Sequence, residues 1–278
     1  MNSPWIQNSI KTLSSCGISD ASREIFIILS HILKISPGEA EARLLSNRID
    51  GAVISRAEYF LKIRCETRKP LAYILKKCEF FGLEFYIDEN VLVPRPETEM
   101  LVEATLSNLP DERLVGVDVG TGSGAVAISL LKNRKNWTIF GTDISRPALD
   151  VAMRNAKIHD VAERFIPLQC DMLQPIKSID FIVSNPPYIP SGEIFSLSAE
   201  VLNEPRIALD GGKDGLHFIK KLIEQSTVLS RRLVALEFGY GQREKIEMIL
   251  KKNKIREAKF IKDMAGIQRV CVFSPQLF

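Results

Sequence analysis

The tetrapeptide Asn185-Pro186-Pro187-Tyr188 has the residue types best suited to holding a flat polar group. Two consecutive prolines stiffen the backbone and remove two amide donors, which leaves carbonyl oxygens as acceptors. The side-chain oxygen of Asn185 and the carbonyl of Pro186 can each accept one hydrogen of a planar NH2 group. The ring of Tyr188 offers a face on which that group can stack. The sequence therefore predicts a slot for an amide or aromatic amine nitrogen, with Asn185, Pro186 and Tyr188 as its catalytic residues.

A glycine-rich turn, Gly120-Thr121-Gly122-Ser123-Gly124, follows an apolar run earlier in the chain. Glycines in such a turn let the backbone bend tightly and approach a ligand closely. About 20 residues further on stands Asp143, where a carboxylate can accept hydrogen bonds from two ribose hydroxyls, as in dinucleotide folds. The loop reads GxGxG, whereas the GxGxxG fingerprint places a helix N-terminus against a pyrophosphate. A ligand with a ribose and no phosphate fits better, and S-adenosyl-L-methionine is one, with Asp118 suited to its ammonium group.

Both motifs also have a purely structural interpretation, because glycine and proline punctuate turns whether or not a ligand binds. Their order favours the functional interpretation, since Asn185 follows a strand-like run beyond the glycine loop and its acidic partner. Together they predict methyl transfer, in which the cofactor supplies an activated methyl group. A slot that holds both hydrogens aligns the nitrogen with that methyl group and stabilises the positive charge that develops on nitrogen.

Alternating strand-like and helical segments must position these residues. From about residue 95 onward the alternation predicts a mainly parallel sheet with helices on both faces. The last two strand-like runs have only a short connection, so an antiparallel pair is expected near the end. The strand candidates are Leu114–Val119, Trp137–Thr142, Phe165–Cys170, Asp180–Ser184, Arg232–Phe238, Ala258–Ile261 and Gln268–Phe273. In an open parallel sheet, ligands bind beyond the carboxyl ends of the strands, where the strand order reverses.

The first part of the chain has a different pattern. Helical spacing of apolar residues extends to about residue 78, and Ser36-Pro37-Gly38-Glu39 has the sequence of a capping box with proline at the first helical position. Between residues 79 and 94, aromatic residues around Gly82 indicate a hairpin of short strands. We therefore expect a helical bundle over 1–78, a linking β-hairpin over 79–94 and a catalytic domain over 95–278.

Composition and charge limit the partners, the compartment and the metal sites that the sequence predicts. The chain has 278 residues, with 37 Lys and Arg against 34 Asp and Glu, a net charge of +3. This balance does not indicate a stable nucleic-acid partner. Five scattered cysteines without metal-ligand spacing favour a reducing, cytoplasmic environment and no metal site. No apolar stretch approaches the roughly 20 residues of a membrane span, so no membrane partner is expected.

The motifs resemble those of class I S-adenosylmethionine-dependent methyltransferases that act on exocyclic or amide nitrogens. Nearly the whole chain resembles the bacterial release-factor glutamine N5-methyltransferases. The slot alone is shared with DNA and RNA adenine methyltransferases, so it is the whole set of landmarks that makes the resemblance specific. The landmarks are Pro70-Leu71-Ala72-Tyr73-Ile74, Glu79-Phe80-Phe81-Gly82-Leu83, Val93-Pro94-Arg95-Pro96-Glu97-Thr98-Glu99, Asp118 to Gly124, Asn185 to Tyr188, Glu204-Pro205, Ala208-Leu209 through Gly215, and Asp263-Met264-Ala265-Gly266 with Arg269.

The resemblance implies a Rossmann-like α/β sheet, mostly parallel with an antiparallel strand near the end, and a small N-terminal helical bundle that recognises the substrate. It implies methylation of the glutamine in the Gly-Gly-Gln motif of peptide chain release factors to N5-methylglutamine, with S-adenosyl-L-methionine as cofactor. The cofactor would be bound by Gly120, Thr121, Gly122, Ser123, Gly124, Asp143, Asp171, Met172 and Asn185. Asp143 would meet the ribose, and Asp171 and Met172 would lie along the adenine. Asn185, Pro186, Pro187 and Tyr188 would form the glutamine slot.

Other functions remain open from the residues. An adenine N6-methyltransferase on DNA or RNA would use the same slot on a flipped base, although the chain has no separate target-recognition segment. A ribosomal-protein glutamine methyltransferase would differ mainly in the N-terminal region. A cofactor-binding protein that kept only the fold is disfavoured by the intact Asn185 and Tyr188. The basic residues between 62 and 77 are expected on a solvated helix face; they are Lys62, Arg64, Arg68, Lys69, Lys76 and Lys77.

Overall fold

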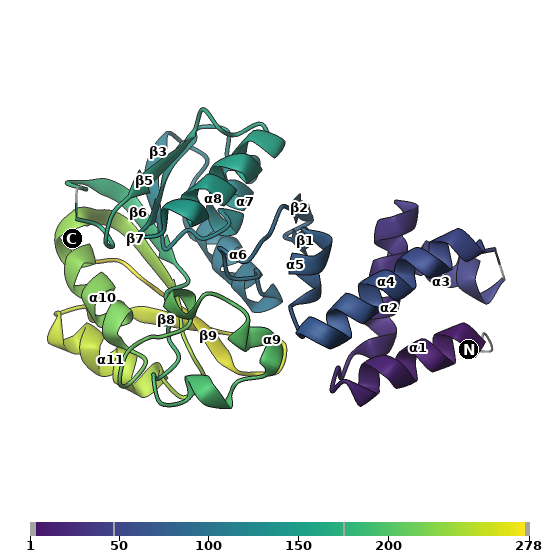
Figure 1. Cartoon of the computed structure of the whole chain (residues 1–278). Helices are drawn as coiled ribbons and strands as arrows, with labels where there is room; N and C mark the ends of the chain where they lie inside the picture. Colours follow the sequence, from purple (N-terminus) through teal and green to yellow (C-terminus); the bar gives the residue numbers. More distant parts are fainter. Residues whose placement is uncertain (1–3, 47, 175, 276–278) are drawn as a thin grey trace. The chain divides into compact units, whose positions relative to one another are not determined.

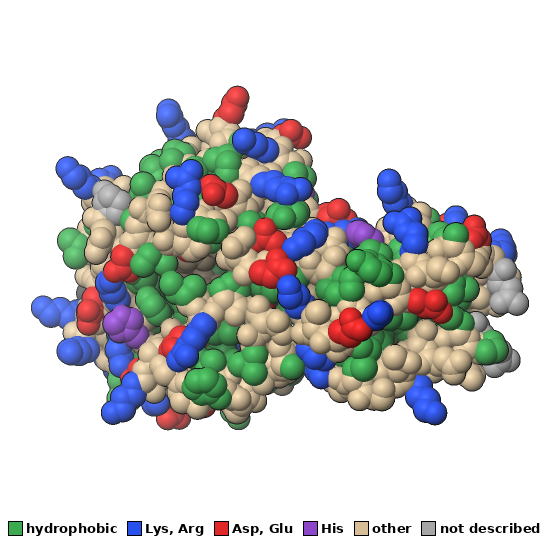
Figure 2. Space-filling model, in the orientation of Figure 1, with side chains coloured by type: hydrophobic (Ala, Val, Ile, Leu, Met, Phe, Trp, Pro, Cys, Tyr) green, Lys and Arg blue, Asp and Glu red, His purple; other side chains and the backbone are tan. Residues whose placement is uncertain are grey.

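The computed structural model describes residues 4–46, 48–174 and 176–275 (Figure 1). The chain divides into two compact units, each with its own hydrophobic core. Unit 1 comprises residues 1–76 and 199–203, and unit 2 comprises residues 77–198 and 204–278. On the face shown in Figure 2, basic and acidic side chains are interspersed without a continuous field of one sign. Over the described residues, no helix is both long and apolar enough to cross a membrane.

Unit 1 is a helical bundle. α3 begins where the capping box predicts, because the Ser36 hydroxyl accepts a hydrogen bond from Glu39 N at 3.2 Å and Pro37 occupies the first turn. Apolar side chains at helical spacing, such as Ile25, Ile28 and Leu29, are fully buried. The helices are α1 (Pro4–Ser15), α2 (Ala21–Leu33), α3 (Pro37–Leu45), α4 (Gly51–Thr67), α5 (Leu71–Leu75) and the later α9 (Ala199–Leu202).

Arg64 of α4 is only 3% exposed, so the expectation of a solvated basic face is wrong for this residue. Its guanidinium donates two hydrogen bonds to the carboxylate of Glu24, each at 2.9 Å, and pairs with Glu200 of α9 at 3.0 Å. Arg68 pairs with the same Glu200 oxygen at 2.7 Å. The two carboxylates compensate the cost of burying the cation. This ion-pair cluster includes α9 in unit 1, although the chain on either side of α9 belongs to unit 2.

Unit 2 begins with a hairpin. β1 (Cys78–Phe80) and β2 (Leu83–Phe85) pair antiparallel, with Cys78 opposite Phe85. The two turn residues both have positive φ, 52° at Phe81 and 70° at Gly82, as a two-residue hairpin turn of matching twist requires. The Phe81 amide donates a hydrogen bond to Glu99 Oε1 at 2.8 Å, which ties this turn to the start of α6 (Glu99–Asn108).

The core of unit 2 is a seven-stranded sheet with the order β5-β4-β3-β6-β7-β9-β8. The first five strands in this order are parallel, and β9 runs antiparallel to both β7 and β8. This confirms the predicted α/β sheet with antiparallel strands near the end. The strands are β3 (Leu114–Val119), β4 (Trp137–Asp143), β5 (Phe165–Gln169), β6 (Ile179–Ser184), β7 (Ser230–Glu237), β8 (Ala258–Lys262) and β9 (Gln268–Phe273).

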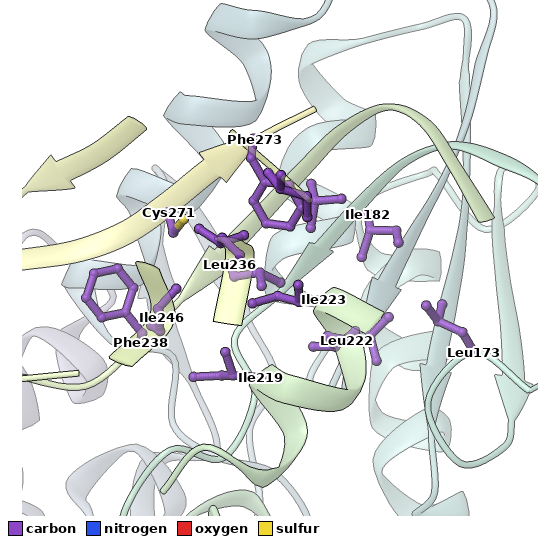
Figure 3. Packing of buried hydrophobic residues seen from close by; sticks show 14 of the residues in the cluster. Leu173, Ile182, Ile219, Leu222, Ile223, Leu236, Phe238, Ile246, Cys271 and Phe273 are labelled. Atoms are coloured by element: carbon purple, nitrogen blue, oxygen red, sulfur yellow. The ribbon is translucent and has the colours of Figure 1, made fainter. Parts of the chain in front are cut away.

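The longer helices of unit 2 cover this sheet. α7 (Ala125–Asn133) packs between α6 and α8 (Arg146–Ile158); α7 lies along β3, β4 and β5, and α8 lies along β4 and β5. α10 (His217–Leu229) and α11 (Arg243–Lys252) bury side chains such as Ile219 and Ile246 against Ile182 and Leu236 of the sheet (Figure 3). The described residues of the unit also form the short 3-10 turns η1 (Pro96–Thr98), η2 (Ile194–Ser196) and η3 (Arg206–Ala208).

The strand order reverses beside β3. The chain runs outward from β3 to β4 and β5, and then returns to β6 on the other side of β3. Ser184 at the end of β6 donates a hydrogen bond to the carbonyl of Val119 at 2.7 Å, so the carboxyl ends of β3 and β6 lie together. This reversal is where an open parallel sheet offers room for a ligand.

Candidate active site

A pocket lies at the reversal, and its walls come from the carboxyl ends of β3, β4, β5 and β6. Eight of the predicted site residues line it: Gly120, Gly122, Asp143, Asp171, Met172, Asn185, Pro186 and Pro187. Four others, Thr121, Ser123, Gly124 and Tyr188, are outside its lining. Within the described part of the chain, no group of three or more His, Cys, Asp or Glu side chains is placed to hold a metal ion.

The glycine loop follows β3 and depends on positive φ at three positions: 70° at Gly120, 54° at Gly122 and 80° at Gly124. The amides of Gly120 and Thr121 both donate to the carbonyl of Thr142, at 2.8 and 2.9 Å. A side chain on Gly124 would place its Cβ 2.8 Å from Ile128 Cδ1. Hydrogen bonds therefore join the start of the loop to the end of β4, and the last glycine of the loop packs against α7.

The carboxylate of Asp143 is held from two sides. Oδ2 accepts a hydrogen bond from Gly122 N at 3.0 Å, and Oδ1 accepts one from Ser145 N at 2.9 Å. Burial raises the pKa of this carboxyl, and the amides of Ser145 and Gly122 oppose that rise. Each oxygen keeps a lone pair that can accept from a ligand hydroxyl in the pocket.

Asp118 lies behind the glycine loop, outside the pocket lining. The side chain is 2% exposed, and Oδ2 accepts from the Thr121 hydroxyl at 2.7 Å and from Ala127 N at 3.3 Å. Burial raises the pKa of Asp118 to about 7. The residue braces the loop and the first turn of α7, so the structure gives it a different position from the ammonium partner that the sequence suggested.

An apolar wall follows β5. Met172 has a φ of 59° and is buried, and it lines the pocket together with Ile144 and Phe218. Asp171, the residue before it, pairs with Lys221 of α10 at 2.6 Å. These three side chains give the pocket an apolar wall.

Asn185 follows directly on β6 and lines the pocket. Its side-chain nitrogen Nδ2 donates a hydrogen bond to the Thr98 hydroxyl at 3.0 Å. Because this bond uses the NH2 end of the amide, the oxygen Oδ1 is the end left for a ligand.

The side chain of Tyr188 lies beside the end of β7. Its hydroxyl donates to Glu237 Oε1 at 3.3 Å, and its carbonyl accepts from Gln242 Nε2 at 2.9 Å. Burial and the nearby carboxylate of Glu237 raise the pKa of the phenol above its ordinary value. The ring packs against the core cluster of Figure 3, whereas the sequence predicted a stacking face inside the slot.

Sequence reasoning missed several residues of the site. Glu237 ends β7 at the same sheet edge, so the rule that functional residues follow strand ends could have identified it. Thr98 stands in a segment that reads as an ordinary helix start, and nothing in its pattern indicates a contact with Asn185. The remaining missed residues of the lining include Asn90, Val91, Leu92, Pro205, Ile207 and Ala208.

A buried ion pair between Glu204 and Arg95 holds the segment that carries Pro205, Ile207 and Ala208. The side chain of Glu204 is fully buried, pairs with Arg95 at 2.5 Å and accepts a hydrogen bond from Val93 N at 3.1 Å. Burial raises the pKa of Glu204, and the Arg95 guanidinium opposes that rise. Since Pro205 follows directly, the pair fixes the backbone where it enters the pocket wall.

The mostly parallel sheet and the pocket at the carboxyl ends of its strands define a methyltransferase of the Rossmann-like class. The chain matches the family model "Methyltransferase small domain" over residues 96–235. A solved structure of the hMettl16 catalytic domain in complex with a MAT2A 3′UTR hairpin is similar in fold, with a TM-score of 0.59 and 15% identity over 82% of each chain.

The sequence of the chain places it more narrowly. It is 36% identical over 270 residues to the release factor glutamine methyltransferase of Aquifex aeolicus, covering 95% of this chain and 94% of that relative. It is 42% identical over 208 residues to the enzyme of the same name from Coxiella burnetii, covering 73% and 74%. The chain belongs to the release factor glutamine methyltransferase family. The resemblance seen in the sequence and the predicted enzyme class are confirmed.

Proposed function

We propose that this protein transfers a methyl group from S-adenosyl-L-methionine to the side-chain nitrogen of the glutamine in the Gly-Gly-Gln motif of peptide chain release factors. One observation carries the proposal. In this member of the family, the Asn185-Pro186-Pro187 slot, the glycine loop and Asp143 line the same pocket. A cofactor site and a planar-amide site at one sheet edge are what a methyl transfer between the two requires.

The pocket suits the cofactor. A Cβ built on Gly120 would meet nothing within 4 Å, so the loop leaves open space toward the ligand. Asp143 offers acceptors for ribose hydroxyls, and Met172 with Ile144 offers an apolar surface for a flat base. S-adenosylmethionine supplies a methyl group already activated on a sulfonium. We assign Thr121, Ser123 and Gly124 the role of holding the loop, because they support its backbone from outside the lining.

The slot residues position the glutamine amide. Oδ1 of Asn185 and the carbonyl of Pro186 accept its two hydrogens, so the nitrogen is directed along the line of displacement. The same acceptors stabilise the positive charge that develops on nitrogen as its bond to the methyl carbon forms. In this displacement the carbon–sulfur bond of the cofactor would break and S-adenosylhomocysteine would leave, and one amide hydrogen would pass to solvent as a proton, which restores the neutral amide. Tyr188 fixes the end of the turn through its bond to Glu237.

We assign recognition of the release factor body to unit 1 and place the protein's activity in the cytoplasm, where release factors work. The support is that unit 1 has a complete core of its own, while the pocket lining comes from unit 2 among the described residues. A separate helical unit in a chain whose catalytic unit is otherwise complete is suited to selecting a macromolecular substrate.

The test is transfer of labelled methyl from S-adenosylmethionine to a purified bacterial release factor and to the same factor with its Gly-Gly-Gln glutamine changed to alanine. We expect label on the intact factor only, and loss of label with Asn185→Ala. Asn253→Ala, at the end of α11, is the matched control and should transfer label like the wild type. Label on duplex DNA with none on the factor would overturn the substrate assignment.

A further inference from the structure

The amide of Asn185 can present either its oxygen or its NH2 group to the pocket, and only the oxygen can accept a hydrogen from a substrate amide. The bond from Asn185 Nδ2 to Thr98 Oγ1 selects the correct orientation. Thr98 is 4% exposed and belongs to η1, so its hydroxyl is held in place by the surrounding core. A hydroxyl can also donate, however, and a donating Thr98 would favour the reversed amide.

Glu237 decides which way the Thr98 hydroxyl points. Its side chain is 1% exposed at the end of β7, and hydrogen bonding from the hydroxyls of Thr98 and Tyr188 lowers its pKa. Tyr188 donates to Oε1, and Oε2 is a buried acceptor that no described residue satisfies, so it is the oxygen available to the Thr98 hydroxyl. An ionised carboxylate only accepts, so the Thr98 hydrogen points toward Glu237 and its lone pairs point toward Asn185.

We propose that Glu237 is a positioning residue that accepts from the Thr98 and Tyr188 hydroxyls and thereby fixes which end of the Asn185 amide faces the pocket. The carboxylate thus bonds to Tyr188 directly and acts on Asn185 through Thr98, without touching the substrate. This inference rests on the proposed function, because an amide substrate is what makes the orientation of Asn185 matter.

Which end of the Asn185 amide faces the pocket depends on whether Glu237 is ionised. Burial and, to a smaller extent, the charge of Glu97 raise its pKa to about 7, against the opposing effects of the two hydroxyls and of Arg269 of β9. Above that pKa, the Glu237 carboxylate can only accept. Thr98 must then donate to Glu237 and accept from Asn185, so only one orientation of the Asn185 amide is allowed. Below that pKa, the carboxylic acid can donate to Thr98, and the reversed Asn185 amide becomes accessible.

Methyl transfer to the release factor, measured from pH 5.5 to 9 with the full chain, tests this role. We expect wild-type kcat to rise with pH around 7 and the Glu237→Gln enzyme to have a lower, flat profile. Thr98→Val, which removes the hydroxyl, should lower kcat about tenfold to hundredfold with little change in cofactor affinity, while Thr98→Ser should recover most of the loss. Thr105→Val is the matched control, because Thr105 is buried but its hydroxyl bonds only to Leu101 O in α6. It should keep the wild-type kcat.

The side-chain amide signals of Asn185 in an NMR spectrum provide a readout without turnover. They should shift with pH around 7 in the wild type and stay constant in Glu237→Gln. Wild-type kcat in Thr98→Val, or amide signals that do not respond to pH, would overturn the inference. If the wild type transfers no methyl to a release factor while the amide signals still follow Glu237, the proposed function fails and the positioning by Glu237 stands.

Discussion

The backbone amide of Gly122 donates a hydrogen bond to Oδ2 of Asp143 over 3.0 Å, across a separation of 21 residues in the chain. The loop after β3 and the acidic residue that ends β4 are therefore one structural feature. A change in either residue alters both the shape of the loop and the acceptors offered to a ligand.

Asp143→Ala should weaken binding of S-adenosylmethionine about tenfold to hundredfold, because it removes ribose acceptors and leaves the Gly122 amide without its partner. Isothermal titration calorimetry measures this directly. Asp150→Ala, an exposed acidic residue of α8, is the control and should bind like the wild type. Wild-type affinity in Asp143→Ala would show that the carboxylate does not contact the cofactor.

Gly124→Ala should destabilise unit 2 by about 1–3 kcal/mol, since φ is 80° and the new methyl group would lie 2.8 Å from Ile128 Cδ1 and 3.2 Å from Ala152 Cβ. The free energy of unfolding in urea is the measurement. Gly51→Ala, at the start of α4, meets nothing within 4 Å and should change stability little or raise it. Equal effects of the two substitutions would contradict the packing argument.

Arg64→Ala should destabilise unit 1 by about 3–5 kcal/mol, because the partly buried carboxylate of Glu24 loses its cation and that of Glu200 keeps only Arg68. Fluorescence of Trp5, recorded in a Trp137→Phe background, follows unfolding of this unit alone. Arg43→Ala removes a solvent-exposed pair with Glu39 and should cost less than about 1 kcal/mol. Equal losses in the free energy of unfolding for Arg64→Ala and Arg43→Ala would contradict this prediction.

Asp118→Asn should change how stability depends on pH. The folded pKa of Asp118, about 7, lies above its ordinary value, so the folded state binds one more proton than the unfolded state between roughly pH 4 and 7. The stabilisation from Asp118 is complete below this window and is lost as pH rises through it. The stability of the wild type relative to Asp118→Asn should therefore fall by up to about 1.4 kcal/mol per pH unit. Urea unfolding at several pH values measures the difference, and a constant difference would contradict the raised pKa.

The sheet could be predicted from the sequence because strand patterns are local. Leu114–Val119 and Gln268–Phe273 have the predicted bounds, and Asp180–Ser184 differs only in starting one residue earlier, at Ile179. The positions of Asp143 and Asn185 at the sheet edge follow from the same patterns, since each residue comes at the end of a strand.

The direction of individual side chains could not be predicted. Tyr188 follows two prolines, and the residue order does not say that its hydroxyl reaches Glu237, 49 residues further along the chain. The burial of Arg64 depends on Glu200, which belongs to a segment far away in the sequence. Such contacts are set by tertiary packing, which residue types and spacing do not encode locally.

The membership of α9 in unit 1 means that the N-terminal bundle is not a contiguous stretch of sequence. On the ribosome, residues 4–76 emerge long before Glu200, so Arg64 has only Glu24 as its counter-ion until most of the chain has been made. A cut after residue 76 would likewise yield a fragment that lacks one helix and one acidic partner. The bundle can reach its final form only after the strands that carry the catalytic slot have been synthesised.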